Sequence, residues 1–234
     1  MTKRLISLSL FTLVCLLAYF LLKPDPNQQV MRFSLPWEIT VNDDGTSEVF
    51  GLTLEQTNLA QAIAHLGMDY KLAIIANQDN YAALEAYYSH FSSGPIRGKL
   101  ILVVDAPQQA LADIQDNPAA SKYMASGARQ FLLNPDDKQR AEQWPIKSLS
   151  FIPAVNLEQD LIEQRFGKPQ SIIAETETTR HLLYPKLGLD AVISDEAKEQ
   201  LLYVAPRSFS SLEQPLQTLD SDNKSGNEIS NGGL

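Results

Sequence analysis

Two stretches of this chain show the same succession of helix-like run, glycine and strand-like runs, and this succession limits the folds that the chain can adopt. In each, a run with helical spacing of apolar residues ends in glycine, at Gly67 and at Gly167. Several strand-like runs with turn residues between them follow both glycines. Because the same order recurs about 100 residues later, we predict an α+β fold with a duplicated domain. Its two αβββ units would pack their helices on antiparallel sheet.

The first unit is predicted to span residues 51–105. Its helix is expected in GLTLEQTNLAQAIAHLG, where Thr53 and Gln56 have the spacing of a capping box. Gly67 is placed to end this helix. The later segment GPIRGK has two glycines and a lysine, but it lacks the spacing of a phosphate loop and does not lead into a helix. We interpret it as a hairpin loop.

The second unit is predicted to span residues 153–206. Asn156 and Gln159 have capping-box-like spacing, and the helix that follows is expected to end at Gly167. A phosphate loop at Gly167 and Lys168 would need a strand before it and a helix N-terminus after it. Here the order is reversed, so the nearby end of the helix dipole is negative. The stretch is therefore interpreted as the end of a helix.

The remaining parts of the folded domain, residues 31–207, are a hairpin and a connector. Asp44-Gly45 between two β-rich runs predicts a hairpin turn, and the acidic spacing of a calcium loop is absent. The connector, residues 106–146, is predicted to be mostly helical, with a short strand at 129–134 as an alternative within it. Residues 208–234 are rich in Ser, Asn, Asp and Gly, which predicts a disordered tail.

The N-terminus carries an uncharged apolar run, Leu5 to Leu22, which as a helix would cover about 27 Å. We predict that residues 1–22 form a transmembrane anchor and residues 23–30 a polar tether. A cleaved signal peptide and a lipoprotein acylated at Cys15 are the alternatives. Lys3 and Arg4 precede the run, so the N-terminus is expected in the cytoplasm. In a Gram-negative bacterium the anchor would lie in the inner membrane and the domain in the periplasm.

The same two units resemble the SmpA/OmlA outer-membrane lipoproteins and the related β-lactamase-inhibitor-protein fold. The first unit carries the resemblance at Gly51, Thr53, Leu66 and Gly67, and the second at Phe166, Gly167, Pro169 and Tyr184. The resemblance implies a Gly-x-Thr helix start, a helix that ends in Leu-Gly-x-Pro and a three-stranded meander with an aromatic residue. It also implies a small non-enzymatic module that works by protein contact at the cell envelope.

Composition and spacing argue against several other functions. A net charge of -9 and a pI near 4.8 argue against nucleic-acid binding. His65, His90 and His181 have no partners at metal-ligand spacing, so structural roles are favoured, and no metal or cofactor is predicted. No G-x-S-x-G motif is present, and Glu175 and Glu177 are expected on exposed faces. The chain is therefore predicted not to be an enzyme.

Aromatic residues are the candidates for protein contact, because Trp and Tyr are common at interaction hot spots. The candidates are Trp37, Tyr87, Tyr88 and Trp144. Each lies in or beside an amphipathic run, so packing in the core is the favoured alternative. The predicted function is an anchored periplasmic interaction module that binds another envelope protein. An inhibitor or regulator of an envelope hydrolase and an enzyme of unrecognised type remain alternatives.

Overall fold

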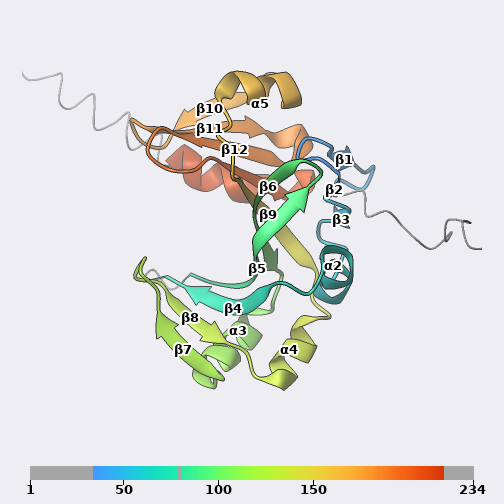
Figure 1. Ribbon diagram of the computed structural model, residues 1–234, viewed down its shortest axis with the longest axis vertical. Helices are drawn as coiled ribbons and strands as arrows, with labels where there is room; N and C mark the ends of the chain where they lie inside the picture. The colour runs from blue at the N-terminus through green and yellow to red at the C-terminus, as the bar shows by residue number, and fades with distance from the viewer. Residues whose placement is uncertain (1–33, 78–80, 219–234) are drawn as a thin grey trace, which may run out of the picture. The chain divides into compact units, whose positions relative to one another are not determined.

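The computed structural model describes residues 34–77 and 81–218, which form an α+β domain on one large antiparallel sheet (Figure 1). The predicted α+β class with antiparallel sheet is confirmed. The predicted anchor, Leu5 to Leu22, and the tether lie outside the described residues. Within 34–77 and 81–218, no helix is both long and apolar enough to cross a membrane.

The large sheet has the strand order β10-β11-β12-β13-β9-β6-β5-β4-β8-β7. In Figure 1, β10–β12 and α5 lie at one end of the sheet and β7, β8 and α4 at the other, with the long strands β5, β6 and β9 between them. The strands are β4 (Lys71–Ala76), β5 (Ala82–Ser93), β6 (Ile96–Val104), β7 (Ala120–Tyr123), β8 (Arg129–Leu132), β9 (Ile146–Pro153), β10 (Ser171–Ala174), β11 (Thr179–Tyr184), β12 (Leu189–Ser194) and β13 (Gln200–Val204).

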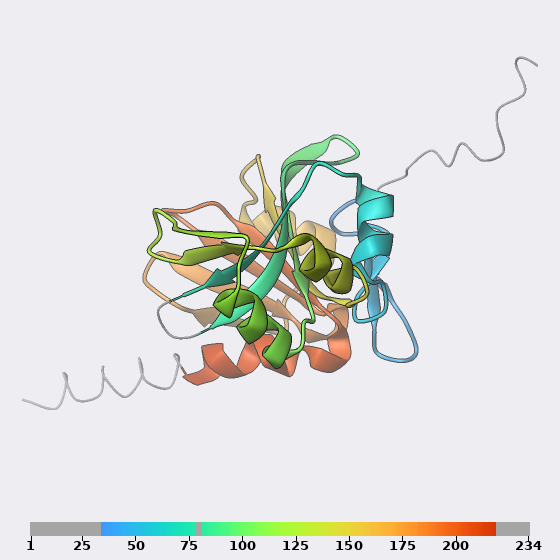
Figure 2. The ribbon, with the colours of Figure 1, turned by 90° about the horizontal axis from the view of Figure 1, so that it is seen from below.

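A small three-stranded sheet precedes the large one and contains β1 (Thr40–Val41), β2 (Ser47–Val49) and β3 (Leu52–Thr53). The predicted turn at Asp44-Gly45 is confirmed: it joins β1 to β2, and Asp44 accepts hydrogen bonds from the Thr46 amide and hydroxyl. Figures 1 and 2 both show this sheet and α2 (Leu59–Leu66) together at one side of the large sheet.

The helix α2 begins later than the sequence predicted. Thr53 lies in β3, so the predicted capping box with Gln56 is wrong, and the Gly-x-Thr motif belongs to a hairpin instead of a helix start. The observed capping box is formed by Asn58 and Gln61, each of whose side chains accepts the other's backbone N–H. The helix ends at Gly67, as predicted, and β4, β5 and β6 follow.

The helix α5 (Gln159–Phe166) ends at the second predicted glycine. The Gly167 amide donates to the Glu163 carbonyl, and φ of Gly167 is 84°. The N-cap is Glu158, which has no side-chain capping bond, so the predicted capping role of Asn156 and Gln159 is wrong. Asn156 instead accepts a hydrogen bond from Lys198. The strands β10, β11 and β12 follow, with the short 3-10 helix η1 (Pro185–Leu187) between β11 and β12.

The connector is less helical than predicted. It contains α3 (Gln108–Asp116) and α4 (Pro135–Ala141), but a hairpin of β7 and β8 lies between them. The strand β8 pairs with β4, with Phe131 opposite Ile74, and so extends the large sheet. The short strand that the sequence allowed at 129–134 is therefore part of this sheet.

The predicted disordered tail begins too early. A 3-10 helix, η2 (Pro206–Ser208), follows β13, and residues 210–218 are helical. Phe209 and Leu216 are buried against Ile173, Leu183 and Val204 in a small second core. Residues 219–234 lie outside the described part of the chain.

The main core lies on the other face of the sheet and is centred on aromatic rings. Phe50 makes edge-on contacts with Phe91, Phe151 and Tyr203, at centroid distances of 5.2, 5.5 and 5.9 Å. The hydroxyl of Tyr203 is satisfied, because it donates to the Pro36 carbonyl at 2.9 Å. Residues far apart in the chain therefore meet beneath the central strands, which fixes the sheet in place.

Candidate functional site

The face of the central strands that turns away from the main core is only partly covered. Along β6, Leu100 and Leu102 are buried in the core, whereas Lys99 and Ile101 point to the opposite side. We call this side the open face. The side chains on this face that are at least partly exposed include Glu85, Tyr87, Ser92, Arg97, Lys99, Ile101, Val103, Ser148, Ile152, Gln200 and Leu202.

One of the four predicted contact residues lies on the open face. Tyr87 pairs with Lys71 on one side and with Ile101 on the other, and its ring is partly exposed. Its neighbour Tyr88 points to the core and is 2% exposed. The prediction of Tyr88 as a contact residue is therefore wrong, because successive side chains of a strand alternate between its faces.

The two tryptophans lie elsewhere. The Arg165 guanidinium stacks over the Trp37 ring at 4.4 Å from its centroid, and Trp144 packs against the main core beside α2. Both are half-buried. Among the described residues, no ring contact joins any two of the four candidates, so the structure does not gather them into one aromatic site.

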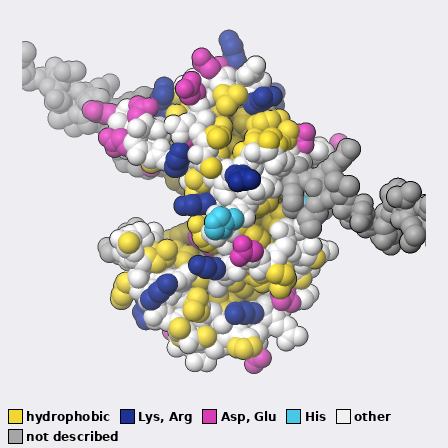
Figure 3. Space-filling model, in the orientation of Figure 1, with side chains coloured by type: hydrophobic (Ala, Val, Ile, Leu, Met, Phe, Trp, Pro, Cys, Tyr) yellow, Lys and Arg dark blue, Asp and Glu magenta, His cyan; other side chains and the backbone are white. Residues whose placement is uncertain are grey.

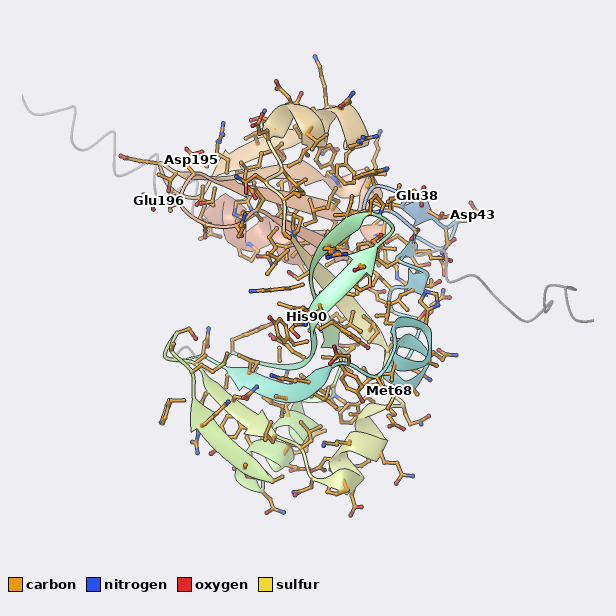
Figure 4. All side chains as sticks on the ribbon, in the orientation of Figure 1. Glu38, Asp43, Met68, His90, Asp195 and Glu196 are labelled. Carbon is orange, nitrogen blue, oxygen red and sulfur yellow. The ribbon has the colours of Figure 1, made fainter. Side chains whose placement is uncertain are left out.

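A hollow of about 450 Å³ opens at one end of the open face, and we call it the cationic pocket. Figure 4 labels His90 on β5 beside this hollow, and Figure 3 shows Lys and Arg side chains near the histidine in the same orientation. A volume of this size fits a small-molecule ligand. The pocket is lined by Ser89, His90, Phe91, Ser92, Arg97, Gly98, Lys99, Ile152, Pro153, Ala154 and Lys198.

Three fixed positive charges line the cationic pocket, and no carboxylate does. Arg97 and Lys99 are two residues apart on β6 and so share one face, while Lys198 comes from the loop between β12 and β13. None of the three forms an ion pair with an Asp or Glu in the described ranges. Lys198 donates to the neutral Asn156 amide oxygen at 2.6 Å. The pocket is therefore positive in a chain whose net charge is -9.

The floor of the cationic pocket is apolar and closely packed. Phe91 is 4% exposed, and its ring contacts Phe151 at a centroid distance of 5.9 Å. A Cβ at Gly98 would overlap both the Phe151 ring and the Ile152 carbonyl oxygen. The strands β6 and β9 thus approach so closely that only glycine fits, which holds the floor rigid.

A buried polar cluster lies on the second core's side of the sheet. His181 of β11 contacts Asp190 of β12 through Nδ1 at 2.7 Å and Glu175 through Nε2 at 3.3 Å. His181 and Asp190 are 7% and 1% exposed, and Asp190 Oδ1 has no hydrogen-bond partner among the described atoms. Burial lowers the pKa of His181, but the two carboxylates outweigh it and hold that pKa above its ordinary value. Burial raises the pKa of Asp190.

This cluster was not predicted from the sequence. Glu175 is exposed, as predicted, but no sequence signal connected it with His181, for which only a structural role was expected. The available signal was a charged residue inside each of two apolar strands, RHLLY and LDAVIS. Which of these residues meet depends on the register, in which Leu183 lies opposite Asp190.

The other histidines are placed differently. His65 Nε2 lies 3.0 Å from the Phe50 carbonyl oxygen, which agrees with the predicted structural role. His90 is exposed beside the cationic pocket. In residues 34–77 and 81–218, no group of three or more His, Cys, Asp or Glu side chains is arranged so that it could hold a metal ion.

The His181 cluster predicts a pH dependence of stability. Because the folded pKa of His181 is raised above the unfolded value near 6.5, its contribution is fully present below that pH. It is lost as pH rises through the folded pKa. We expect the free energy of unfolding, measured by urea titration between pH 6 and pH 9, to fall less steeply with pH in His181→Gln than in the wild type.

The exposed histidine supplies the matched control, since His90→Gln is expected to keep the wild-type pH dependence. Equal slopes for the wild type and His181→Gln over this range would contradict the role assigned to His181.

Comparisons with known proteins do not place the chain in a class. No family model matches it, and neither a curated protein nor a solved structure shows significant similarity to it.

Proposed function

We propose that this chain is a non-enzymatic interaction module of the bacterial cell envelope, which binds another envelope protein through the open face. The observation that carries the proposal is the partly exposed apolar surface of Tyr87, Ile101, Val103 and Leu202 on the central strands. These strands are braced from behind by the main core, so the surface is rigid before binding.

The chemistry of the open face also describes the partner. Tyrosine and branched apolar side chains at its centre favour a partner with an apolar contact patch. Arg97 and Lys99 border this centre, so acidic residues at the rim of the partner would complement the face. The partner we propose is therefore a protein with an apolar patch bordered by Asp or Glu.

The proposed location rests on the apolar run of the sequence. Leu5 to Leu22 would anchor the protein in the inner membrane, and the tether would present the domain to the periplasm. In that arrangement, protease added to intact cells leaves the domain whole. Protease added after the outer membrane is permeabilised cleaves it.

Site-specific photocrosslinking in living cells tests the interaction. A crosslinking residue at Ile101 is expected to yield one discrete adduct, and Tyr87→Ala is expected to reduce that adduct at unchanged protein level. The matched control places the same crosslinker at Gln109, an exposed position on α3. An adduct from Gln109 with none from Ile101 would show that the open face is not the contact surface.

We also propose that the domain arose by duplication of an αβββ unit, as the resemblance to SmpA/OmlA proteins implies. The support is one recurring contact: the Tyr88 hydroxyl donates to the Gly67 carbonyl at 3.2 Å, and the Tyr184 hydroxyl donates to the Gly167 carbonyl at 3.0 Å. Each tyrosine lies on the second strand after its helix. In both cases the tyrosine hydroxyl ties the end of a helix to the second strand that follows it in the chain.

Equivalent contacts should have similar energies. We expect Tyr88→Phe and Tyr184→Phe each to lower the free energy of unfolding by about 1 kcal/mol, the usual net value of one hydrogen bond. The two losses should add in the double variant, because the sites are far apart in the sheet order. Urea titration measures all three. A loss confined to one tyrosine would argue against equivalent roles.

A further inference from the structure

We propose that the cationic pocket binds a phosphate monoester whose organic part is apolar. This inference goes beyond the interaction function and does not rest on it, because the pocket occupies only one end of the open face. It concerns a small ligand that the purified protein can bind in the absence of any partner.

The positive charge of the pocket favours an anionic ligand. Arg97, Lys99 and Lys198 bring three positive charges to one hollow, and no described carboxylate neutralises them. Like charges held close together repel, so an anion that enters gains attraction to all three at once. The acidity of the whole chain makes an accidental cluster of bare cations less expected here than in a basic protein.

The number and kind of donors favour phosphate over carboxylate. A phosphate monoester carries close to two negative charges at neutral pH and three acceptor oxygens. Arg97 offers a planar fork of donors, Lys99 and Lys198 offer point charges, and the Ser89 and Ser92 hydroxyls lie in the same lining. A carboxylate has one charge and two oxygens, so it would leave part of this set without a partner.

The floor favours an apolar group on the phosphate. Phe91, Ile152 and Pro153 contribute apolar surface beside the cations, and the packing of Gly98 against Phe151 keeps that surface from collapsing. Free phosphate would leave this surface in contact with water. A ring or short chain esterified to the phosphate would cover it, which adds hydrophobic free energy to the charge attraction.

Binding of a defined probe tests the proposal. Isothermal titration calorimetry of the full chain in a non-ionic detergent, at low salt, would use 1-naphthyl phosphate. We expect saturable binding with one site per chain. 1-Naphthoate, with the same ring and one charge, and inorganic phosphate, without the ring, are each expected to bind at least about tenfold more weakly.

Matched charge variants locate the site. The triple variant Arg97→Gln/Lys99→Gln/Lys198→Gln is expected to bind 1-naphthyl phosphate at least about tenfold more weakly. The control Lys122→Gln/Lys168→Gln/Lys186→Gln removes the same charge, and Lys168 and Lys186 come from a second hollow beside η1. It should bind like the wild type. If the triple variant fails to fold, Lys99→Gln and Lys198→Gln alone should each weaken binding about threefold.

Two results would overturn the proposal. One is the absence of 1-naphthyl phosphate binding to the wild type, and the other is equal binding by the wild type and the pocket variants. A further arm separates two sources of the same chemistry, since phosphatidic acid added to the micelles would displace the probe if a lipid headgroup is the natural ligand. Without displacement, a soluble phosphate monoester is the ligand. Phosphatidylcholine, which lacks a monoester, is the control lipid.

Discussion

Gly188→Ala is expected to destabilise the domain by about 3 kcal/mol or more, as measured by urea-induced unfolding. Gly188 joins η1 to β12 with φ at +68°, in the left-handed region that costs other residues about 1 to 2 kcal/mol. A Cβ at this position would also overlap the carbonyl oxygen of Val204. That oxygen belongs to the backbone of β13, and the Val204 amide donates to the Gly188 carbonyl at 2.9 Å. The overlap is relieved only if two hydrogen-bonded segments separate.

Gly94→Ala separates the steric cost from the backbone cost. Gly94 has a similar φ of +59°, but a Cβ there would meet only the end of the Leu35 side chain at 3.3 Å. We expect a loss of about 1 kcal/mol, mostly from the backbone conformation. Equal losses of unfolding free energy in the two variants would mean that the close approach of Gly188 to Val204 does not add to the cost of the substitution.

Phe209→Ala is expected to lower the free energy of unfolding by about 3 to 5 kcal/mol, the usual range for a buried phenylalanine. Phe209 is 3% exposed and joins η2 to the helical residues 210–218. Its ring packs with Leu183 and Val204 in the second core, so its loss would leave a cavity under the segment. Since a domain is stable by only about 5 to 15 kcal/mol, a loss of this size would remove a large share of the total stability.

An exposed residue of the same segment provides the comparison. Gln217→Ala changes an exposed side chain and should shift stability by less than about 0.5 kcal/mol. A loss for Phe209→Ala as small as that for Gln217→Ala would mean that the segment does not contribute to the folded domain.

The parts of the fold that sequence predicted correctly depend on neighbouring residues. Asp44-Gly45 specifies a turn because few other residues accept its backbone angles, and Gly67 and Gly167 end helices for the same reason. GPIRGK was interpreted as a hairpin loop, and its first two residues do lie in the turn between β5 and β6, whereas the rest of the segment already belongs to β6. Such signals act within a few residues, so one sequence suffices to read them.

The errors come from contacts between distant residues. The strand β8 exists because Phe131 pairs opposite Ile74, and no local pattern shows that pairing. Thr53 and Gln56 have the spacing of a capping box, but pairing of β3 with β2 holds Thr53 in a strand. Phe209 and Leu216 lie in a polar stretch, and the apolar surface that receives them comes from β10, β11 and β13. Tertiary contacts therefore order a stretch whose composition had predicted disorder.

The candidate site could be predicted only in part, for the same reason. The spacing of Arg97 and Lys99 indicates one shared face of a strand. Lys198, however, joins them from another region of the chain, and the apolar floor depends on the pairing of Lys99 opposite Ile152. Of the four aromatic candidates, only Tyr87 lies on the open face, because Tyr88 alternates to the opposite face of β5 and the two tryptophans lie outside the strands.

The position of β9 in the sheet has a consequence for how the protein unfolds. This strand pairs with β6 on one side and with β13 on the other, so it joins the part of the sheet that contains β4–β6 to the part that contains β10–β13. Neither part of the sheet could unfold alone without leaving an unpaired strand edge on the remaining part and exposing the Phe50 and Phe151 rings beneath β9. Heat or denaturant should therefore unfold the sheet in a single cooperative transition, and a destabilising substitution in either part of the sheet should lower the stability of the whole.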